Sequence, residues 1–102
     1  MTFGTQIAEA RKALGLTQKD LASKITKEDG KAISPQYLND IEHDRRNPPS
    51  EDMINQFAKQ LKLQAEILFY LAGKLPEDMK NPSVGQERIV AAYRAFRKAL
   101  KK

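Results

Sequence analysis

The stretch SPQYLNDIEHDRRNPPS, residues 34–50, decides the fold because it contains both the start and the stop of a helix. Ser34 is a good N-cap, and Pro35 at the first helical position loses no hydrogen bond, since that N–H has no partner within a helix. The two prolines near its end cannot continue the helix. The stretch therefore predicts a helix over residues 34–44, and it raises the question of why so short a helix carries three carboxylates.

Apolar residues on either side recur at helical spacing, with no convincing alternation of period two, so the sequence predicts an all-α fold. A first helix is expected over residues 3–14, stopped by Gly15, and a second from a Thr17–Asp20 capping box to at least Ile25. A fourth helix is expected to begin at a Ser50 cap, and a fifth to cover residues 64–72. A sixth is expected to run from a Ser83–Gln86 capping box to about Leu100.

The composition limits the classes of protein that remain. A chain of 102 residues with 40% apolar residues is the size of one domain with a modest core. The absence of cysteine excludes disulfides, zinc–thiolate sites and thiol catalysis. No apolar run approaches the roughly 20 residues of a membrane span, and the N-terminus lacks the apolar segment of a signal peptide. A cytoplasmic protein without membrane partners is expected.

The net charge of +5 lies entirely in the last part of the chain. Residues 1–73 contain ten Lys/Arg and ten Asp/Glu, whereas residues 74–102 contain eight Lys/Arg and three Asp/Glu. Net charge therefore says nothing in favour of nucleic-acid binding by the first part, and any such function must depend on which faces the charges occupy.

We expect residues 1–73 to form one domain, and residues 74–102 to form a linker and a C-terminal helix. The apolar stripe of that helix has two open interpretations: it packs back on the helix before it, or it pairs with a second copy of the chain. This packing or dimerisation surface consists of Phe69, Tyr70, Ile89, Tyr93, Phe96 and Leu100.

Two segments, GLTQKDLASKI (15–25) and ISPQYLNDIEHDRRNPPSEDMINQFAKQL (33–61), resemble the Cro/CI-repressor type of helix-turn-helix proteins, the Xre-like family. The resemblance covers about residues 3–72. It implies a compact five-helix lambda-repressor-like domain with an additional C-terminal helix. It also implies a sequence-specific transcriptional regulator, a repressor, that binds palindromic double-stranded DNA as a homodimer and reads the major groove with helix 34–44.

The helical wheel of this recognition helix divides it into two faces. Leu38, Ile41 and Glu42 share the inner face, which leaves the other side for base edges. The predicted base-reading residues are Pro35, Gln36, Tyr37, Asn39 and Asp40. The amides of Gln36 and Asn39 suit adenine, and Pro35 suits a thymine methyl group. For Asp40 three interpretations stay open: it accepts from cytosine, it orients a neighbouring side chain, or it is solvated at the rim.

Phosphate contacts are expected at the N-terminus of the second helix and just after the recognition helix, where backbone N–H groups and basic side chains are available. These predicted residues are Thr17, Gln18, Lys19, Ser34, Arg45, Arg46 and Asn47. The connection over residues 26–33 is longer than the family's usual turn. Either the second helix extends through Lys27 or Glu28, or Lys27 and Lys31 reach a phosphate from a loop.

The other two carboxylates of the stretch are given structural interpretations. Glu42 on the inner face needs a partner, because an unpaired buried carboxylate is costly. Similar domains join this position to that of Arg11 by an ion pair, and Arg11 lies on the inner stripe of the first helix. Asp44, beyond the helix end, is expected to be solvated beside Arg45 and Arg46.

Enzymatic and metal-dependent functions are not expected. His43 is the only histidine, there is no glycine-rich phosphate loop, and alternate acidic residues on a helix do not share a face. No cofactor or metal is predicted. One alternative from another class remains: an antitoxin or adaptor module whose main role is to bind a partner protein.

Overall fold

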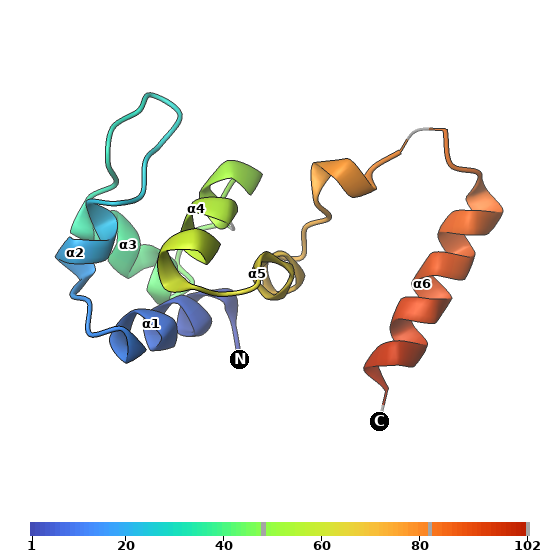
Figure 1. Cartoon of the computed structure of the whole chain (residues 1–102), viewed down its shortest axis with the longest axis horizontal. Helices are drawn as coiled ribbons and strands as arrows, with labels where there is room; N and C mark the ends of the chain where they lie inside the picture. Colours follow the sequence, from blue (N-terminus) through green and yellow to red (C-terminus); the bar gives the residue numbers. More distant parts are fainter. Residues whose placement is uncertain (48, 82, 102) are drawn as a thin grey trace.

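The computed structural model describes residues 1–47, 49–81 and 83–101; Pro48, which was expected to help stop the third helix, lies outside them, as do residues 82 and 102 of the predicted C-terminal region. The elements are α1 (Phe3–Ala13), α2 (Gln18–Ala22), α3 (Pro35–Glu42), α4 (Glu51–Leu61), α5 (Ala65–Ala72), the 3-10 turn η1 (Glu77–Met79) and α6 (Gln86–Leu100). The predicted all-α class, with five helices followed by an additional one, is confirmed (Figure 1).

The core lies where α1 packs against α3, α4 and α5, with α2 packed on α3. The apolar stripes of these helices supply its fully buried side chains, including Ile7, Leu38 and Phe57. Phe3 and Phe57 meet edge to face, with ring centroids 6.5 Å apart. The described helices include none that is long and apolar enough to cross a membrane.

Side-chain caps begin α2, α3 and α4 as the sequence predicted. Thr17, Ser34 and Ser50 each accept a backbone N–H from the first turn, and Asp20 completes the capping box of α2.

The C-terminus of α3 is set by its backbone conformation, not by a side-chain cap. The residue after the C-cap of α3, Asp44, has a left-handed backbone (φ 57°), which ends the helix at Glu42 rather than at residue 44.

The expected extension of the second helix was wrong. α2 ends at Ala22, and residues 26–32 form a small antiparallel hairpin instead, with a bridge between Thr26 and Ala32. Gly30, at φ 81°, makes its turn. Ile25 and Ile33 are buried at the base of the hairpin and joined by a 2.9 Å backbone hydrogen bond, so burial of both isoleucines favours a hairpin over a longer helix.

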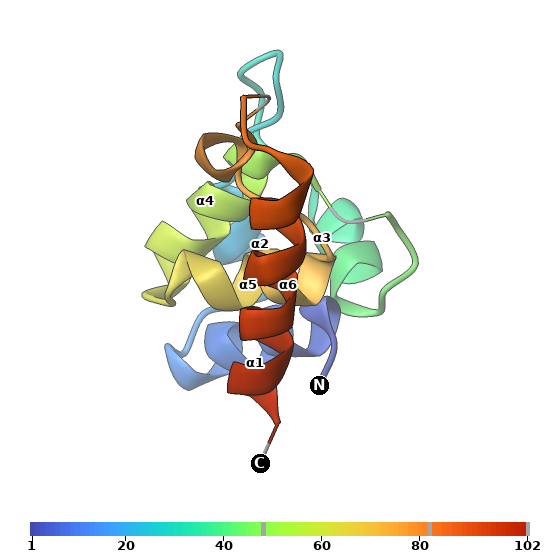
Figure 2. The same cartoon turned by 90° about the vertical axis from the view of Figure 1, so that its right-hand side faces the viewer.

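The predicted capping box of the last helix was also wrong. The N-cap of α6 is Gly85 and has no side-chain hydrogen bond, whereas the Ser83 N–H donates to Asn81 Oδ1 in the preceding turn. α6 stands apart from the other helices, on the far side of α5 from α2 and α3 (Figures 1 and 2). The radius of gyration is 15.5 Å, above the roughly 13 Å of a compact domain of this size, because α6 stands away from the core.

Candidate functional site

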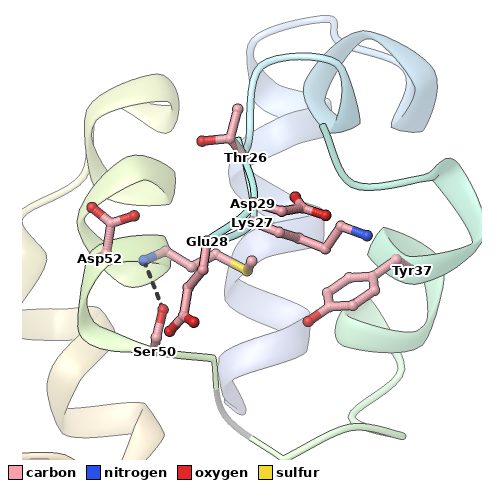
Figure 3. Close-up of a pocket in the computed structure, with 8 residues that line it drawn as sticks. Thr26, Lys27, Glu28, Asp29, Tyr37, Ser50 and Asp52 are labelled. Carbon is pink, nitrogen blue, oxygen red and sulfur yellow. Dashed lines mark hydrogen bonds between the residues drawn. The ribbon is translucent and has the colours of Figure 1, made fainter. Parts of the chain in front are cut away.

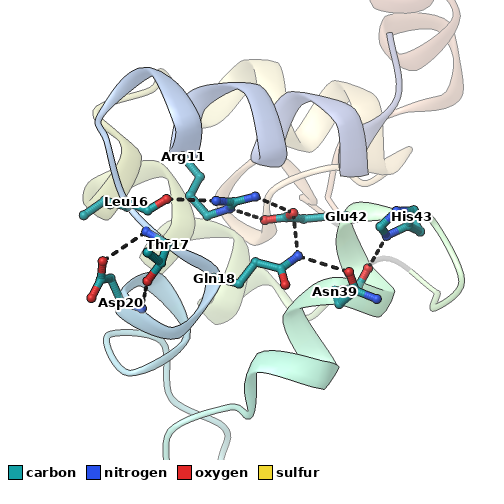
Figure 4. A network of polar contacts seen from close by, with 8 residues as sticks. All are labelled: Arg11, Leu16, Thr17, Gln18, Asp20, Asn39, Glu42 and His43. Carbon is teal, nitrogen blue, oxygen red and sulfur yellow. Dashed lines mark hydrogen bonds and ion pairs between the residues drawn. The ribbon is translucent and has the colours of Figure 1, made fainter.

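The N-terminus of α2 is fixed onto α3 by one side-chain amide. Gln18 Nε2 donates to Asn39 Oδ1 at 3.1 Å and to Glu42 Oε1 at 2.9 Å (Figure 4). Asn39 is half-buried, and its Oδ1 is engaged by Gln18, which leaves its Nδ2 as the free end of the amide. The helices α2 and α3 are thereby held at one separation.

Beneath this bridge lies an ion pair between α1 and α3. Arg11 Nε donates to Glu42 Oε2 at 2.7 Å and Arg11 Nη2 to Oε1 at 3.0 Å, while Nη1 donates to the Leu16 carbonyl at 2.8 Å. The side chains of Arg11 and Glu42 are 9% and 4% exposed. The structure therefore places Glu42 in the core, away from the outer face of α3.

Asp44 has partners that the sequence did not suggest. Its Oδ1 accepts the Gly4 N–H at 2.9 Å, and its Oδ2 accepts the Thr2 hydroxyl at 2.6 Å. Asp44 is exposed, as expected, but it is not only solvated, because the chain turns back at φ 57° and directs its carboxylate at the N-terminus of α1. A negative charge there is favourable to the helix dipole.

The outer face of α3 carries Gln36 and Asp40, one helical turn apart. Gln36 is exposed and its Nε2 donates to Asp40 Oδ1 at 3.0 Å. Asp40 also lies near the two arginines that follow the helix: Arg45 Nη1 is 3.7 Å from Oδ1 and Arg46 Nε is 3.8 Å from Oδ2. The third carboxylate is thus the one on the outer face, and three side chains surround it.

Tyr37 is placed differently from the other predicted base readers. Its side chain is half-buried and packs against the core, and the Arg46 guanidinium lies 3.9 Å from the ring centroid. This is the geometry of a cation–π contact. Sequence reasoning missed the contact because the loop after α3 brings Arg46 back over the helix, and helical spacing gives no sign of that.

The remaining predicted contact residues lie at the surface around these helices. Thr17 and Ser34 accept backbone N–H groups as caps, so their hydroxyl hydrogens stay available to another acceptor. The backbone N–H of Thr17, followed by its hydroxyl, holds the pKa of Asp20 below its ordinary value. The other predicted contact residues, all exposed, are Lys19, Pro35 and Asn47.

The hairpin is anchored to α4 by a residue that sequence reasoning missed. Gln56 accepts the Thr26 N–H at 2.7 Å and donates to the Thr26 carbonyl at 3.0 Å, as a neighbouring strand would. An open pocket lies between the hairpin, Tyr37 and the start of α4 (Figure 3). It is lined by Thr26, Lys27, Glu28, Asp29, Tyr37, Ser50, Asp52 and Met53.

The predicted packing or dimerisation residues fall into two groups. Phe69 is buried in the core, whereas Tyr70 is 58% exposed and meets Phe96 of α6 edge to face at 6.1 Å. The stripe of α6 stays largely open to solvent, since Ile89, Tyr93, Phe96 and Leu100 are all exposed. So much exposed apolar surface on one helix is typical of an interface.

Among the residues that the structure describes, no three acidic or histidine side chains come together as a metal site.

Two comparisons with known proteins indicate the same helical fold. A family model described as Helix-turn-helix (HTH_3) matches residues 7–68, more than half of the chain. Among solved structures, a chain of the SinR protein/SinI protein complex is similar with a TM-score of 0.54 and 22% identity, over 99% of this chain and 84% of that chain. At this identity the likeness concerns the fold. A search of curated proteins gave no match.

Proposed function

This chain belongs to the helix-turn-helix family of Xre-type DNA-binding regulators, and we propose that it binds specific double-stranded DNA sites with α3 in the major groove. The observation that carries the proposal is the Gln18 amide, which joins the start of α2 to Asn39 and Glu42 of α3. A protein that reads bases with one helix and grips phosphate with another needs the two at a fixed separation.

Gln36 and Asn39 are the proposed readers of the bases. The exposed Gln36 amide can form two hydrogen bonds with adenine, whereas the half-buried Asn39, whose Oδ1 accepts from Gln18, offers its Nδ2 to a base acceptor. Pro35, exposed at the first turn, is proposed to contact a thymine methyl group. Tyr37 is better suited to support Arg46 than to read a base, because its ring packs on the core and its face is covered.

Phosphate contacts are proposed on both sides of this helix. On one side lie the N-terminus of α2 and the side chains of Gln18 and Lys19. On the other lie Arg45, Arg46 and Asn47. The two sets flank the outer face of α3, in the way that the two sugar–phosphate backbones of DNA flank its major groove. Blocking a promoter by such binding would make the protein a repressor.

We further propose that the chain binds a palindromic site as a homodimer through α5 and α6. Tyr70, Tyr93 and Phe96 are largely exposed in the monomer, and a second copy would remove this apolar area from water. A single recognition helix reads few base pairs, whereas two copies roughly 34–36 Å apart would read two half-sites one helical turn apart.

Selection of random duplex DNA by the purified full chain, at about physiological salt, tests the proposal. We expect a palindromic consensus. Gln36→Ala and Asn39→Ala should each relax it at one position in each half-site, whereas Asn55→Ala, which removes an exposed amide from α4, should leave it unchanged. Failure to enrich any site, with binding that disappears as salt rises, would contradict sequence-specific recognition.

The dimer has its own test. Tyr93→Ser with Phe96→Ser should give a monomer in equilibrium sedimentation, and should weaken binding to the palindrome while binding to one half-site is unchanged. Arg94→Ser, also in α6 but outside the stripe, is the matched control. A wild-type protein that is monomeric at concentrations well above those of DNA binding would contradict the dimer.

A second candidate function is favoured by the same exposed surface. α5 and α6 could bind a different protein, as an antitoxin or adaptor would, and the similar solved chain comes from a complex of two proteins. The two functions are separated by the selection experiment above. An adaptor predicts no consensus sequence but a stable complex whose formation depends on Tyr93 and Phe96.

A further inference from the structure

We infer that Asp40 is a positioning residue, which raises the specificity of α3 for its site and lowers its affinity for other DNA. The inference rests on the proposed DNA-binding function and names how the recognition surface is tuned. Among the carboxylates of residues 34–50, Asp40 is the one on the outer face of α3, and this face is proposed to contact the negatively charged DNA.

Asp40 first fixes the direction of the Gln36 amide. A carboxylate only accepts hydrogen bonds, so the 3.0 Å contact to Oδ1 requires the Nε2 end of Gln36, and a flipped amide would place two oxygens together. Nε2 keeps a second hydrogen, and Oε1 keeps its lone pairs. These are the donor and the acceptor that match N7 and the amino group of adenine, and the fixed amide presents them in one order.

Asp40 also lowers the positive charge offered by the loop after α3. Its two oxygens lie 3.7 Å from Arg45 and 3.8 Å from Arg46, so one negative charge faces two positive ones. Arg46 is held between this carboxylate and the ring of Tyr37. Contacts with phosphate supply almost all of the affinity for random DNA, so a nearby carboxylate weakens that binding most.

The same contacts argue against direct reading of cytosine by Asp40. Oδ1 is shared by Gln36 and Arg45, and Oδ2 faces Arg46. Although it lies on the outer face of its helix, the Asp40 side chain is only 23% exposed. To accept a hydrogen bond from a cytosine amino group, the Asp40 carboxylate would have to give up its contacts with Gln36 and the two arginines, which lie on the same DNA-facing side.

Asp40→Asn tests the inference, because it removes the charge and replaces one acceptor oxygen by a donor NH2 of similar shape, so that the direction of the Gln36 amide is no longer fixed. With fluorescence anisotropy over a series of salt concentrations, we expect tighter binding to random duplex and a salt dependence steeper by up to about 0.9 in log–log slope. On the selected site, discrimination at the base pair that Gln36→Ala relaxes should fall roughly tenfold. Asp78→Asn, with the same charge change at an exposed position of η1, is the control.

The double variant Gln36→Ala/Asp40→Asn separates positioning from reading. If Asp40 acts through Gln36, its substitution should change no base preference once Gln36 is absent, while binding to random duplex still tightens. Loss of a cytosine preference in both backgrounds would overturn the inference, as would an unchanged affinity for random duplex in Asp40→Asn. A wild-type protein that selects no site would instead overturn the proposed function itself.

Discussion

Arg11 and Glu42 form a buried, two-contact ion pair that joins α1 to the end of α3, and Gln18 shares the Glu42 carboxylate. Their hydrogen bonds are satisfied: among the described residues no buried side-chain nitrogen or oxygen lacks a partner. A pair of this kind is costly to break from one side, because the remaining charge stays buried.

Arg11→Met should therefore lower the free energy of unfolding by about 3–5 kcal/mol, measured from urea denaturation curves. The double variant Arg11→Met/Glu42→Met should recover most of that loss, since it leaves no buried charge. Equal destabilisation of the single and double variants would show that the pair matters through packing alone.

Gly4→Ala should destabilise the protein by about 1–3 kcal/mol. Helix α1 approaches the C-terminus of α3 so closely at Gly4 that an added Cβ would collide with the carbonyl oxygens of Ile41 and Glu42, which are backbone atoms. Gly85→Ala is the control, because nothing lies within 4 Å of a Cβ added there. Thermal unfolding of both variants would check the difference, and equal melting temperatures would contradict the close approach.

Lys62→Gly and Asp44→Gly should have opposite effects, although both residues have a left-handed backbone at a helix end. Glycine relieves the strain at each position, by about 1 kcal/mol. Lys62 has no compensating side-chain hydrogen bond among those described, so Lys62→Gly should raise the melting temperature. Asp44→Gly loses the bonds to Gly4 and Thr2 and should lower it. A stabilised Asp44→Gly variant would show that those bonds contribute little.

The capping box of α2 should make stability depend on pH in the acid range. The backbone N–H of Thr17 lowers the pKa of Asp20 from 3.8, so this carboxylate contributes stability above that value and loses it as the pH falls through the lowered pKa. The stability difference between wild type and Asp20→Asn should be constant near neutral pH and shrink below about pH 4. A difference that stays constant down to pH 2 would contradict this.

The hairpin offers a test of whether the connection touches DNA. The Lys27 N–H donates to the Lys31 carbonyl at 2.9 Å, so the two lysines are cross-strand neighbours with side chains on one face. If both reach phosphates, Lys27→Ala/Lys31→Ala should reduce the salt slope of binding by roughly 1.8, that is about 0.9 for each contact. Lys74→Ala, beyond α5, is the control. An unchanged slope would leave the hairpin outside the interface.

Much of the helical domain was predictable, because its signals are local. The caps at Thr17, Ser34 and Ser50 and the inward direction of Glu42 follow from residues within one or two turns. The hairpin was not predictable in this way: its stability depends on Gln56, 30 residues away from Thr26, and on two isoleucines that reach the core. The role of Asp44 likewise depends on α1 arriving beside it, 40 residues away in sequence.

The outer face of α3 shows the same limit. Helical periodicity predicted that Gln36 and Asp40 lie on the outer face, but the grouping of Gln36, Arg45 and Arg46 around Asp40 requires the chain to fold back after the helix. That return is made by a left-handed residue that is not glycine, and such a residue carries little signal in a sequence.

A continuous series of hydrogen bonds links the buried ion pair to the Asn39 amide of α3. It runs from the Leu16 carbonyl through Arg11, Glu42 and Gln18 to Asn39 (Figure 4). A mutation that repacks the centre would change the tilt of an amide at the surface. If Asn39 reads a base as proposed, a substitution at Arg11 would therefore change the stability of the fold and the choice of DNA site together.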